Sequence, residues 1–178
     1  DWTPNPARLP QGLAGLSKRI NDLGLKFGLW FEPEMVNKDS DLYRAHPDWA
    51  VHTPGRHMNH GRNEFLLNFA NKDVVDNIYG QMSRLLDEAN IAYIKWDMNR
   101  FVSEGYDVTR GAEHQGEAYH RYILGVYDLL ERLLQRFPDL IIEGCASGGG
   151  RFDMGMLYYT PQIWCSDDTD AIERLKIQ

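Results

Sequence analysis

Residues 91–100 read IAYIKWDMNR, an apolar stretch that ends abruptly in charge. If this stretch forms an extended strand, its side chains alternate between two faces. Lys95, Asp97 and Asn99 then share one face, and Trp96 lies with the apolar residues on the other. A lysine and a carboxylate on the same face of a strand would not stabilise a hydrophobic core. The stretch therefore predicts a strand whose carboxyl end reaches a functional rim.

Predicted strands and helices alternate on both sides of this stretch. Short apolar runs predict strands over residues 26–31, 91–97, 140–144 and 162–165. Apolar residues at three- and four-residue steps predict helices over residues 9–24, 72–89 and 113–137. The apolar stripe of the last of these includes Tyr119, and a further helix begins after residues 166–170. Residues 37–63 and 99–112 are long polar loops, which are usually functional or carry short elements of their own.

The alternation predicts an α/β fold with a parallel sheet, because parallel strands need crossover connections. The strands are nearly all apolar, which is typical of strands covered on both faces. Two architectures fit this pattern, a (β/α)8 TIM barrel and a doubly wound open sheet. In both, ligands bind at the carboxyl ends of the strands.

Each predicted strand ends in side chains capable of chemistry. In chain order, the four carboxyl ends supply Trp30, Glu32 and Glu34; Lys95, Asp97 and Asn99; Glu143 and Cys145; and Cys165 and Asp167. A polar residue after one strand is ordinary, because loops begin there. Polar ends on four consecutive strands favour an active-site rim.

Asp97 and Asp167 form the natural pair of carboxyl groups. A nucleophile and an acid that flank a glycosidic bond are typical of retaining glycosidases. The nucleophile must stay ionised, and Lys95 beside Asp97 is expected to lower its pKa. The acid must hold a proton, which a neighbouring carboxylate such as Asp168 or Asp170 would favour. These two neighbours also suit helix capping, which is the simpler interpretation.

Other candidates carry weaker signals. Trp30 is either a platform for a sugar ring or a core residue. Lys95 next to a carboxylate is a poor Schiff-base lysine, since it stays protonated. The glycines after Ser147 lack the Gly-Lys-Ser/Thr ending of a phosphate loop and instead permit close approach of the backbone. The histidines between residues 52 and 60 have no periodic ligand spacing, so no metal site is expected.

The composition limits the classes of partner. The chain has 178 residues and a net charge of −7, which disfavours nucleic acid and anionic membranes as partners. Its two cysteines form no disulfide framework, and reduced thiols point to a cytoplasmic protein. The segment beginning at Asp1 does not resemble a natural start, and Gln178 stops in mid-pattern. We therefore interpret the chain as an excised fragment of one domain.

Four long motifs surround the strand ends: FGLWFEPEMV, YIKWDMNR, EGCASGGGRFD and QIWCSDDTDAIERLKIQ. In this order they resemble the signatures of glycoside hydrolase family 36, the bacterial α-galactosidases. The resemblance implies a (β/α)8 catalytic barrel, of which residues 1–178 hold the third to sixth strands. It also implies retaining hydrolysis of terminal α-galactosides of the melibiose and raffinose type, through a covalent galactosyl–aspartate intermediate. No cofactor or metal is implied, and the full-length parent is expected to be a homo-oligomer.

The resemblance assigns roles to individual residues. Asp97 matches the nucleophile of the KWD motif, and Asp167, rather than Asp168, matches the acid/base of the WxSD motif. The galactose-binding positions of the family fall on Trp30, Arg62, Lys95, Asn99, Cys145 and Gly148. Two adjacent acidic residues that the family places on an earlier strand would lie before Asp1.

Two other functions stay open. Related plant proteins are galactosyltransferases of the raffinose-synthase type, which build raffinose oligosaccharides. A non-catalytic galactoside-binding remnant is the second alternative, although the presence of both Asp97 and Asp167 speaks against it. In each case the expected partners are α-galactoside oligosaccharides. The fragment alone is expected to be weakly active or inactive, because half a barrel has unpaired sheet edges.

Overall fold

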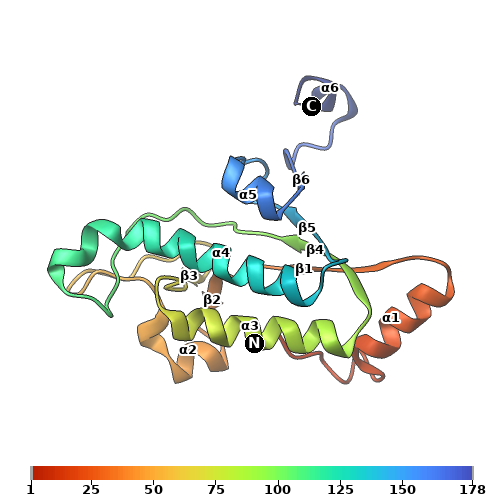
Figure 1. Cartoon of the computed structure of the whole chain (residues 1–178), viewed down its shortest axis with the longest axis horizontal. Coiled ribbons are helices and arrows are strands. Elements are labelled where there is room, and N and C mark those ends of the chain that lie inside the picture. Colours follow the sequence, from red (N-terminus) through yellow and green to blue (C-terminus); the bar gives the residue numbers. More distant parts are fainter. Residues whose placement is uncertain (1, 178) are drawn as a thin grey trace.

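The computed structural model describes residues 2–177 and contains a four-stranded parallel sheet (Figure 1). Its strands are β1 (Phe27–Phe31), β4 (Ile91–Trp96), β5 (Ile141–Gly144) and β6 (Gln162–Ile163), in the spatial order β1-β4-β5-β6. Each pairing in this sheet is parallel. The predicted α/β fold with a parallel sheet is therefore confirmed, and the stretch that includes Lys95 and Trp96 forms the inner strand β4.

Helices α3 (Lys72–Glu88) and α4 (Ala118–Arg136) lie side by side and precede β4 and β5 (Figure 1). Asn71 caps α3, because its side-chain oxygen accepts a hydrogen bond from the backbone N–H of Asp73. The buried apolar side chains of α3 are Val74, Val75, Ile78, Met82, Leu85 and Leu86. Those of α4 include Tyr122, Val126, Leu129, Leu130 and Leu133. These two stripes pack with the sheet into one hydrophobic core.

The predicted helix over residues 113–137 begins later than expected. Residues 112–117 form a 3-10 helix, and α4 starts only at Ala118. Tyr119 is 52% exposed, and Tyr122 takes the buried position instead. The prediction for Tyr119 is wrong because the 3-10 turn changes the phase of the helix relative to the sequence pattern.

The remaining helices are short, and the first polar loop contains unpredicted elements. α1 (Gly12–Asp22) and α6 (Ala171–Ile177) match predicted helices, and α5 (Met154–Tyr159) is an additional short helix. At the two ends of the first loop, β2 (Met35–Asn37) pairs antiparallel with β3 (Glu64–Leu66). Between them lie α2 (Asp41–Ala45) and a 3-10 turn (Pro47–Trp49). Among residues 2–177, no helix is long and apolar enough to cross a membrane.

The two faces of the sheet are covered differently. Phe31, Ile94 and Ile142 belong to the buried core that the sheet shares with the helices. Trp30 and Ile141, on the opposite face, are exposed. The expectation that both faces are covered is therefore not met within residues 2–177, because the helices pack on one face only.

Candidate active site

The strand register places the predicted rim residues next to one another. Trp30 on β1 lies beside Lys95 on β4, which lies beside Glu143 on β5. One step further along, the backbone N–H groups of Asp97 and Cys145 extend the ladder with hydrogen bonds of 2.8 and 2.7 Å. Side chains from three strands therefore meet at the carboxyl edge of the sheet, as the sequence predicts.

Asp97 is buried among hydrogen-bond donors and is only 7% exposed. Its Oδ2 accepts hydrogen bonds from Trp30 Nε1 at 3.0 Å and from Asn99 Nδ2 at 2.7 Å. Its Oδ1 accepts one from the backbone N–H of Met98 at 2.9 Å. The Cys145 thiol also donates to this carboxyl group. Donors from β1, from the loop after β4 and from the end of β5 therefore fix the carboxylate in place.

These hydrogen bonds keep Asp97 ionised. Burial alone would raise the pKa of the Asp97 carboxyl group, but hydrogen bonds from Asn99, Cys145 and Trp30 outweigh it and lower the pKa. Burial, together with the neighbouring charge of Asp97, raises the pKa of the Cys145 thiol to about 11. The thiol therefore stays neutral and can donate. An ionised and oriented carboxylate is what a nucleophile requires.

Lys95 does not account for the lowered pKa of Asp97, contrary to the expectation from sequence. Lys95 Nζ lies 3.4 Å from Glu143 Oε1 and 4.1 Å from the centre of a Trp164 ring. Positions i and i+2 on one strand are about 6.6 Å apart, whereas neighbouring strands are about 4.8 Å apart. Glu143, the register partner of Lys95, is therefore the carboxylate that Lys95 pairs with.

Asp167 lies in the exposed segment after β6. Its Oδ1 accepts a hydrogen bond from Trp164 Nε1 at 2.8 Å. The neighbouring Asp170 accepts one from the backbone N–H of Ile172 at 2.9 Å, at the start of α6. Asp168 in turn accepts one from the N–H of Asp170 at 3.0 Å. These contacts are helix-capping and turn contacts, which supports the simpler interpretation of Asp168 and Asp170.

The glycines after β5 bring their loop against the Asp167 segment. The N–H of Gly149 donates to the carbonyl of Cys165 at 3.1 Å. Gly148 has a φ of +85°, and a Cβ atom there would lie 3.1 Å from Ser166 Cα. Only glycine meets both conditions without strain. The predicted close approach is therefore to the neighbouring backbone of residues 165–167.

Arg62 lies on a strained turn near the rim. Arg62 and the residue after it have φ values of 52° and 62°, a region that non-glycine residues rarely adopt. The Arg62 side chain is 58% exposed, and its Nη1 lies 3.7 Å from Glu32 Oε1. Arg100 holds the same loop, because its Nη2 donates to the carbonyl of Asn59 at 2.6 Å. Arg100 therefore connects the Arg62 loop to the segment that follows β4.

Glu34 does not reach the rim, although strand alternation predicted it there. It is fully buried, at 0% exposure. It accepts hydrogen bonds from Trp96 Nε1 at 2.9 Å and from the Tyr122 hydroxyl, and Arg151 Nη1 lies 2.8 Å away. The alternation fails because β1 ends before Pro33. The result is a buried ion pair between the turn after β1 and the loop after β5, behind the Asp97 site, with hydrogen bonds from β4 and α4.

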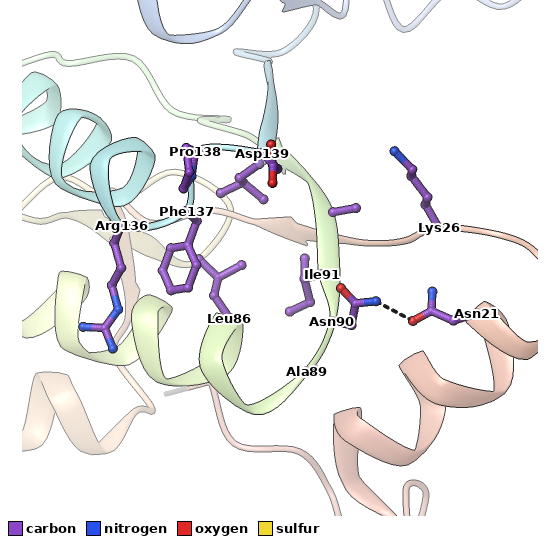
Figure 2. A pocket seen from close by; sticks show the side chains of 12 residues that line it. Asn21, Lys26, Leu86, Ala89, Asn90, Ile91, Arg136, Phe137, Pro138 and Asp139 are labelled. Carbon is purple, nitrogen blue, oxygen red and sulfur yellow. Dashed lines mark hydrogen bonds between the residues drawn. The ribbon is translucent and has the colours of Figure 1, made fainter.

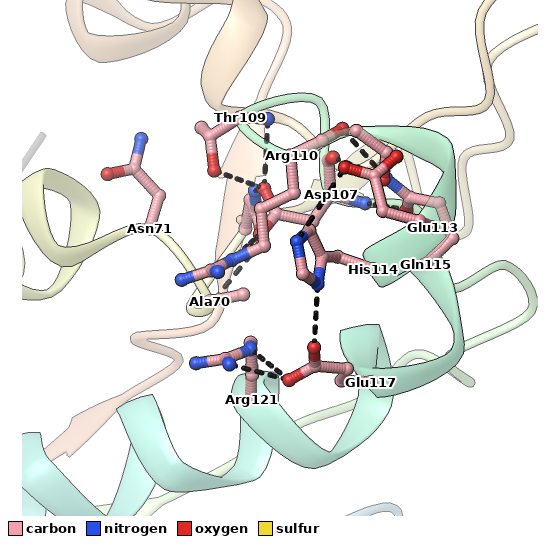
Figure 3. A network of polar contacts seen from close by, with 12 residues as sticks. Ala70, Asn71, Asp107, Thr109, Arg110, Glu113, His114, Gln115, Glu117 and Arg121 are labelled. Carbon is pink, nitrogen blue, oxygen red and sulfur yellow. Dashed lines mark hydrogen bonds and ion pairs between the residues drawn. The ribbon is translucent and has the colours of Figure 1, made fainter.

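A second polar network orders the loop after Asp97 (Figure 3). The buried Asp107 accepts hydrogen bonds on Oδ1 from Asn68 Nδ2 at 2.8 Å and from Thr109 Oγ1 at 2.6 Å. Arg110 Nε lies 3.3 Å from its Oδ2. Burial raises the pKa of Asp107, but these hydrogen bonds outweigh it and lower the pKa. An Asp followed two residues later by Thr is a turn signal that could have revealed this network from sequence.

A hollow of about 440 Å³ lies at the opposite end of the sheet (Figure 2). It is lined by residues around the start of β4, such as Asn90, and by Phe137 and Asp139 before β5. Ligands of parallel α/β folds bind at the carboxyl ends of the strands, so this hollow is not the candidate active site. Among residues 2–177, no group of three or more His, Cys, Asp or Glu side chains could hold a metal ion.

Comparison with known proteins connects this rim to one family. The family model Melibiase matches residues 1–178. The chain belongs to the Melibiase family. This melibiase-family chain is 55% identical over 178 residues to α-galactosidase Mel36A of Lactobacillus acidophilus, a match that covers all of the chain and 24% of that protein. It thus spans about a quarter of the length of this curated relative.

Solved structures of the family confirm the architecture. The crystal structure of GH36 α-galactosidase AgaA from Geobacillus stearothermophilus matches with a TM-score of 0.97 and 52% identity. The match covers 100% of this chain and 25% of the AgaA chain. An AgaA variant in complex with raffinose matches with a TM-score of 0.97 at 51% identity. The four-stranded sheet and its helices are therefore part of a TIM barrel, as the motifs suggested.

Proposed function

We propose that this melibiase-family chain is the central part of the catalytic barrel of a retaining exo-α-galactosidase. Residues 1–178 would supply the third to sixth barrel strands, and the flanking strands and β-domains would belong to the longer protein. The chain's match to about a quarter of Mel36A supports this proposal. Because the sheet of the isolated chain has unpaired edges, we expect the chain alone to be weakly active or inactive.

The proposed reaction uses Asp97 as nucleophile and Asp167 as acid and then base. An Asp97 oxygen forms a bond to the anomeric carbon of galactose while the bond to the leaving oxygen breaks. The leaving oxygen takes the proton of Asp167. Asp167 then removes a proton from water, whose oxygen attacks the anomeric carbon and releases Asp97. Two carboxyl groups about 5–5.5 Å apart suit this double displacement.

The environment of Asp97 is the observation that carries the proposal. Four donors hold its carboxylate ionised and oriented at the rim, and an ionised nucleophile is what the first step needs. The remaining candidate residues would bind the sugar. These are Trp30, Arg62, Lys95, Asn99, Cys145 and Gly148. AgaA variants crystallised with raffinose and stachyose indicate α-galactoside oligosaccharides as substrates of this chain's parent protein.

Release of nitrophenol from p-nitrophenyl α-galactoside by the longer protein tests this function. We expect turnover in the wild type and its loss in Asp97→Asn, because the amide is a poor nucleophile. Asp170→Asn is the matched control, since Asp170 caps α6 and takes no part in the reaction. Galactose binding without turnover by the wild type would contradict the proposal and favour a binding protein.

A further inference from the structure

Trp164 contacts residues on both sides of the rim and has no part in the proposed mechanism. It follows β6 directly, and its backbone N–H donates to the carbonyl of Gly144 at 3.0 Å, which continues the pairing of β6 with β5. Three residues later the chain reaches the exposed Asp167. Trp164 therefore ties the segment that carries Asp167 to the end of the sheet.

The indole of Trp164 is held by two cations. Lys95 Nζ lies 4.1 Å from the centre of an indole ring, and Arg174 Cζ, on α6, lies 4.9 Å from one. Both distances are typical of cation–π contacts. Arg174 Nη1 also donates to the carbonyl of Ser166 at 2.9 Å, next to Asp167. Contacts from the sheet and from the last helix thus fix the indole in place.

Lys95 reaches the indole from a buried anchor on β5. Its Nζ lies 3.4 Å from Oε1 of Glu143, a residue that is almost completely buried. Glu143 Oε2 accepts hydrogen bonds from Gln162 Nε2 at 3.0 Å and from the Tyr93 hydroxyl. Because Glu143 is fixed by these bonds, the position of Lys95 against Trp164 is fixed as well.

The contact between Trp164 and Asp167 distinguishes the two oxygens of the carboxyl group. The indole N–H can only donate, and Nε1 lies 2.8 Å from Asp167 Oδ1. In a carboxylic acid the carbonyl oxygen is a stronger acceptor than the hydroxyl oxygen. The oxygen that faces the indole is therefore favoured as the carbonyl oxygen, and the proton belongs on Oδ2.

We propose that Trp164 is the positioning residue of the acid/base: its N–H holds Asp167 Oδ1, so that Oδ2 carries the proton that passes to the leaving oxygen. As this proton leaves, the carboxyl group becomes negatively charged, and the N–H already in place stabilises the charge. Lys95 is a candidate galactose-binding residue, so its contact with the indole links the sugar to the acid. This role rests on the proposed function, because it requires Asp167 to be the acid.

A series of leaving groups tests this role in the longer protein. Trp164→Phe keeps an aromatic ring for Lys95 and removes the N–H. We expect kcat/KM for raffinose to fall about 10–100-fold, because a misplaced catalytic group is less effective. A dinitrophenyl galactoside, whose leaving group needs no proton, should be affected little. A plot of log kcat/KM against the pKa of the leaving group, for aryl α-galactosides, should therefore be steeper in Trp164→Phe than in the wild type.

Trp49→Phe is the matched control for this series. Trp49 stacks on His46 with 3.9 Å between the ring centres, in the loop between β2 and β3. It has no contact with Asp167 or Lys95 in the described residues 2–177. The same change of side chain at this position should leave the slope of the plot as it is in the wild type.

A double-mutant cycle separates positioning from a structural role. Trp164→Phe should cost much less raffinose turnover in an Asp167→Asn background than in the wild type, because no acid is left to position. Arg174→Met is a second variant for the case in which Trp164→Phe folds poorly. It removes one cation from the indole and should also reduce raffinose turnover more than dinitrophenyl galactoside turnover.

Two results would overturn the proposal. One is a leaving-group plot with the same slope in Trp164→Phe and in the wild type. The other is a cycle in which the losses from Trp164→Phe and Asp167→Asn multiply, because the tryptophan would then act independently of the acid. A wild type that hydrolyses no galactoside would overturn the proposed function and this role together. Turnover with an unchanged slope would overturn this role alone, so the two failures are distinguishable.

Discussion

The two candidate catalytic carboxyl groups occupy opposite environments. Asp97 is buried directly after the inner strand β4 and receives hydrogen bonds from three parts of the rim. Asp167 is exposed after a two-residue strand at the edge of the sheet, and Trp164 donates to it from three residues away. Figure 1 shows β6 and α6 extending away from the body formed by α3 and α4. The proposed nucleophile side, around Asp97, is therefore built by the sheet, and the proposed acid/base side, around Asp167, by local loop contacts.

This contrast leads to the largest expected effect, a difference between substrates. Asp97→Asn in the longer protein should reduce kcat/KM by a factor on the order of 10⁴–10⁶ for both raffinose and a nitrophenyl galactoside. Asp167→Asn should reduce it about 10²–10⁴-fold for raffinose and less for the nitrophenyl substrate, whose leaving group needs no proton. Equal losses for Asp167→Asn on both substrates would contradict its role as acid.

The buried ion pair behind Asp97 should matter most for stability. Glu34→Ala leaves Arg151 buried and unpaired, which we expect to cost about 3–5 kcal/mol of unfolding free energy, measured by urea denaturation. Replacing both residues by apolar ones of similar volume should cost much less. If Glu34→Ala were as stable as the wild type, the nucleophile side would not depend on this ion pair.

The contact between the two sides should be sensitive to one glycine. Gly148→Ala forces an alanine into a left-handed conformation against Ser166, at a cost of about 1–2 kcal/mol. Because the shifted segment carries Asp167, raffinose turnover should fall more than nitrophenyl galactoside turnover. The opposite order would mean that this loop supports Asp97 instead.

The fall in the free energy of unfolding at low pH should reflect the buried carboxylates. This is the smallest expected effect. Asp97 and Asp107 have folded-state pKa values below the ordinary value of 3.8. Their stabilisation is therefore complete above about pH 3.8 and is lost as pH falls through the folded-state values. Asp107→Asn should flatten the dependence of the unfolding midpoint on pH in this acid range.

The same measurement of stability at low pH can be made on a variant next to Asp97. Asn99→Ala removes one donor to Asp97 and should raise the pKa of that carboxyl group. The loss of stability at low pH should then begin at a higher pH than in the wild type. If the loss of stability at low pH were unchanged in both Asp107→Asn and Asn99→Ala, the assigned hydrogen bonds would be contradicted.

Sequence patterns predict the frame of this site well and its neighbours less well. Strand parity places Lys95 and Asp97 on one face, and the parallel sheet confirms the predicted rim. The alternation of side chains along one strand does not predict how neighbouring strands are aligned. That alignment places Glu143 beside Lys95. The alternation also fails where a strand ends, so it placed Glu34 at the rim although that side chain turns into the core.

Contacts between loops were beyond the reach of sequence patterns. Glu64 lies beside Asn37 only because β3 returns antiparallel to β2 across the long polar loop. Arg100 was equally hidden, because its partner is a backbone carbonyl of a distant loop. Such contacts depend on how loops fold over the sheet, and the periodicity of apolar residues along the chain does not predict loop folding.

Covalent trapping tests the central claim most directly. A 2-deoxy-2-fluoro galactosyl fluoride slows release of the enzyme-bound sugar, so the intermediate accumulates on the nucleophile of the longer protein. Peptide mass spectrometry should locate the fluorosugar on Asp97, with full occupancy retained in Asp167→Asn because fluoride leaves without a proton. A label on Asp167 or on any other residue, or no label in an enzyme that turns over galactosides, would contradict the account.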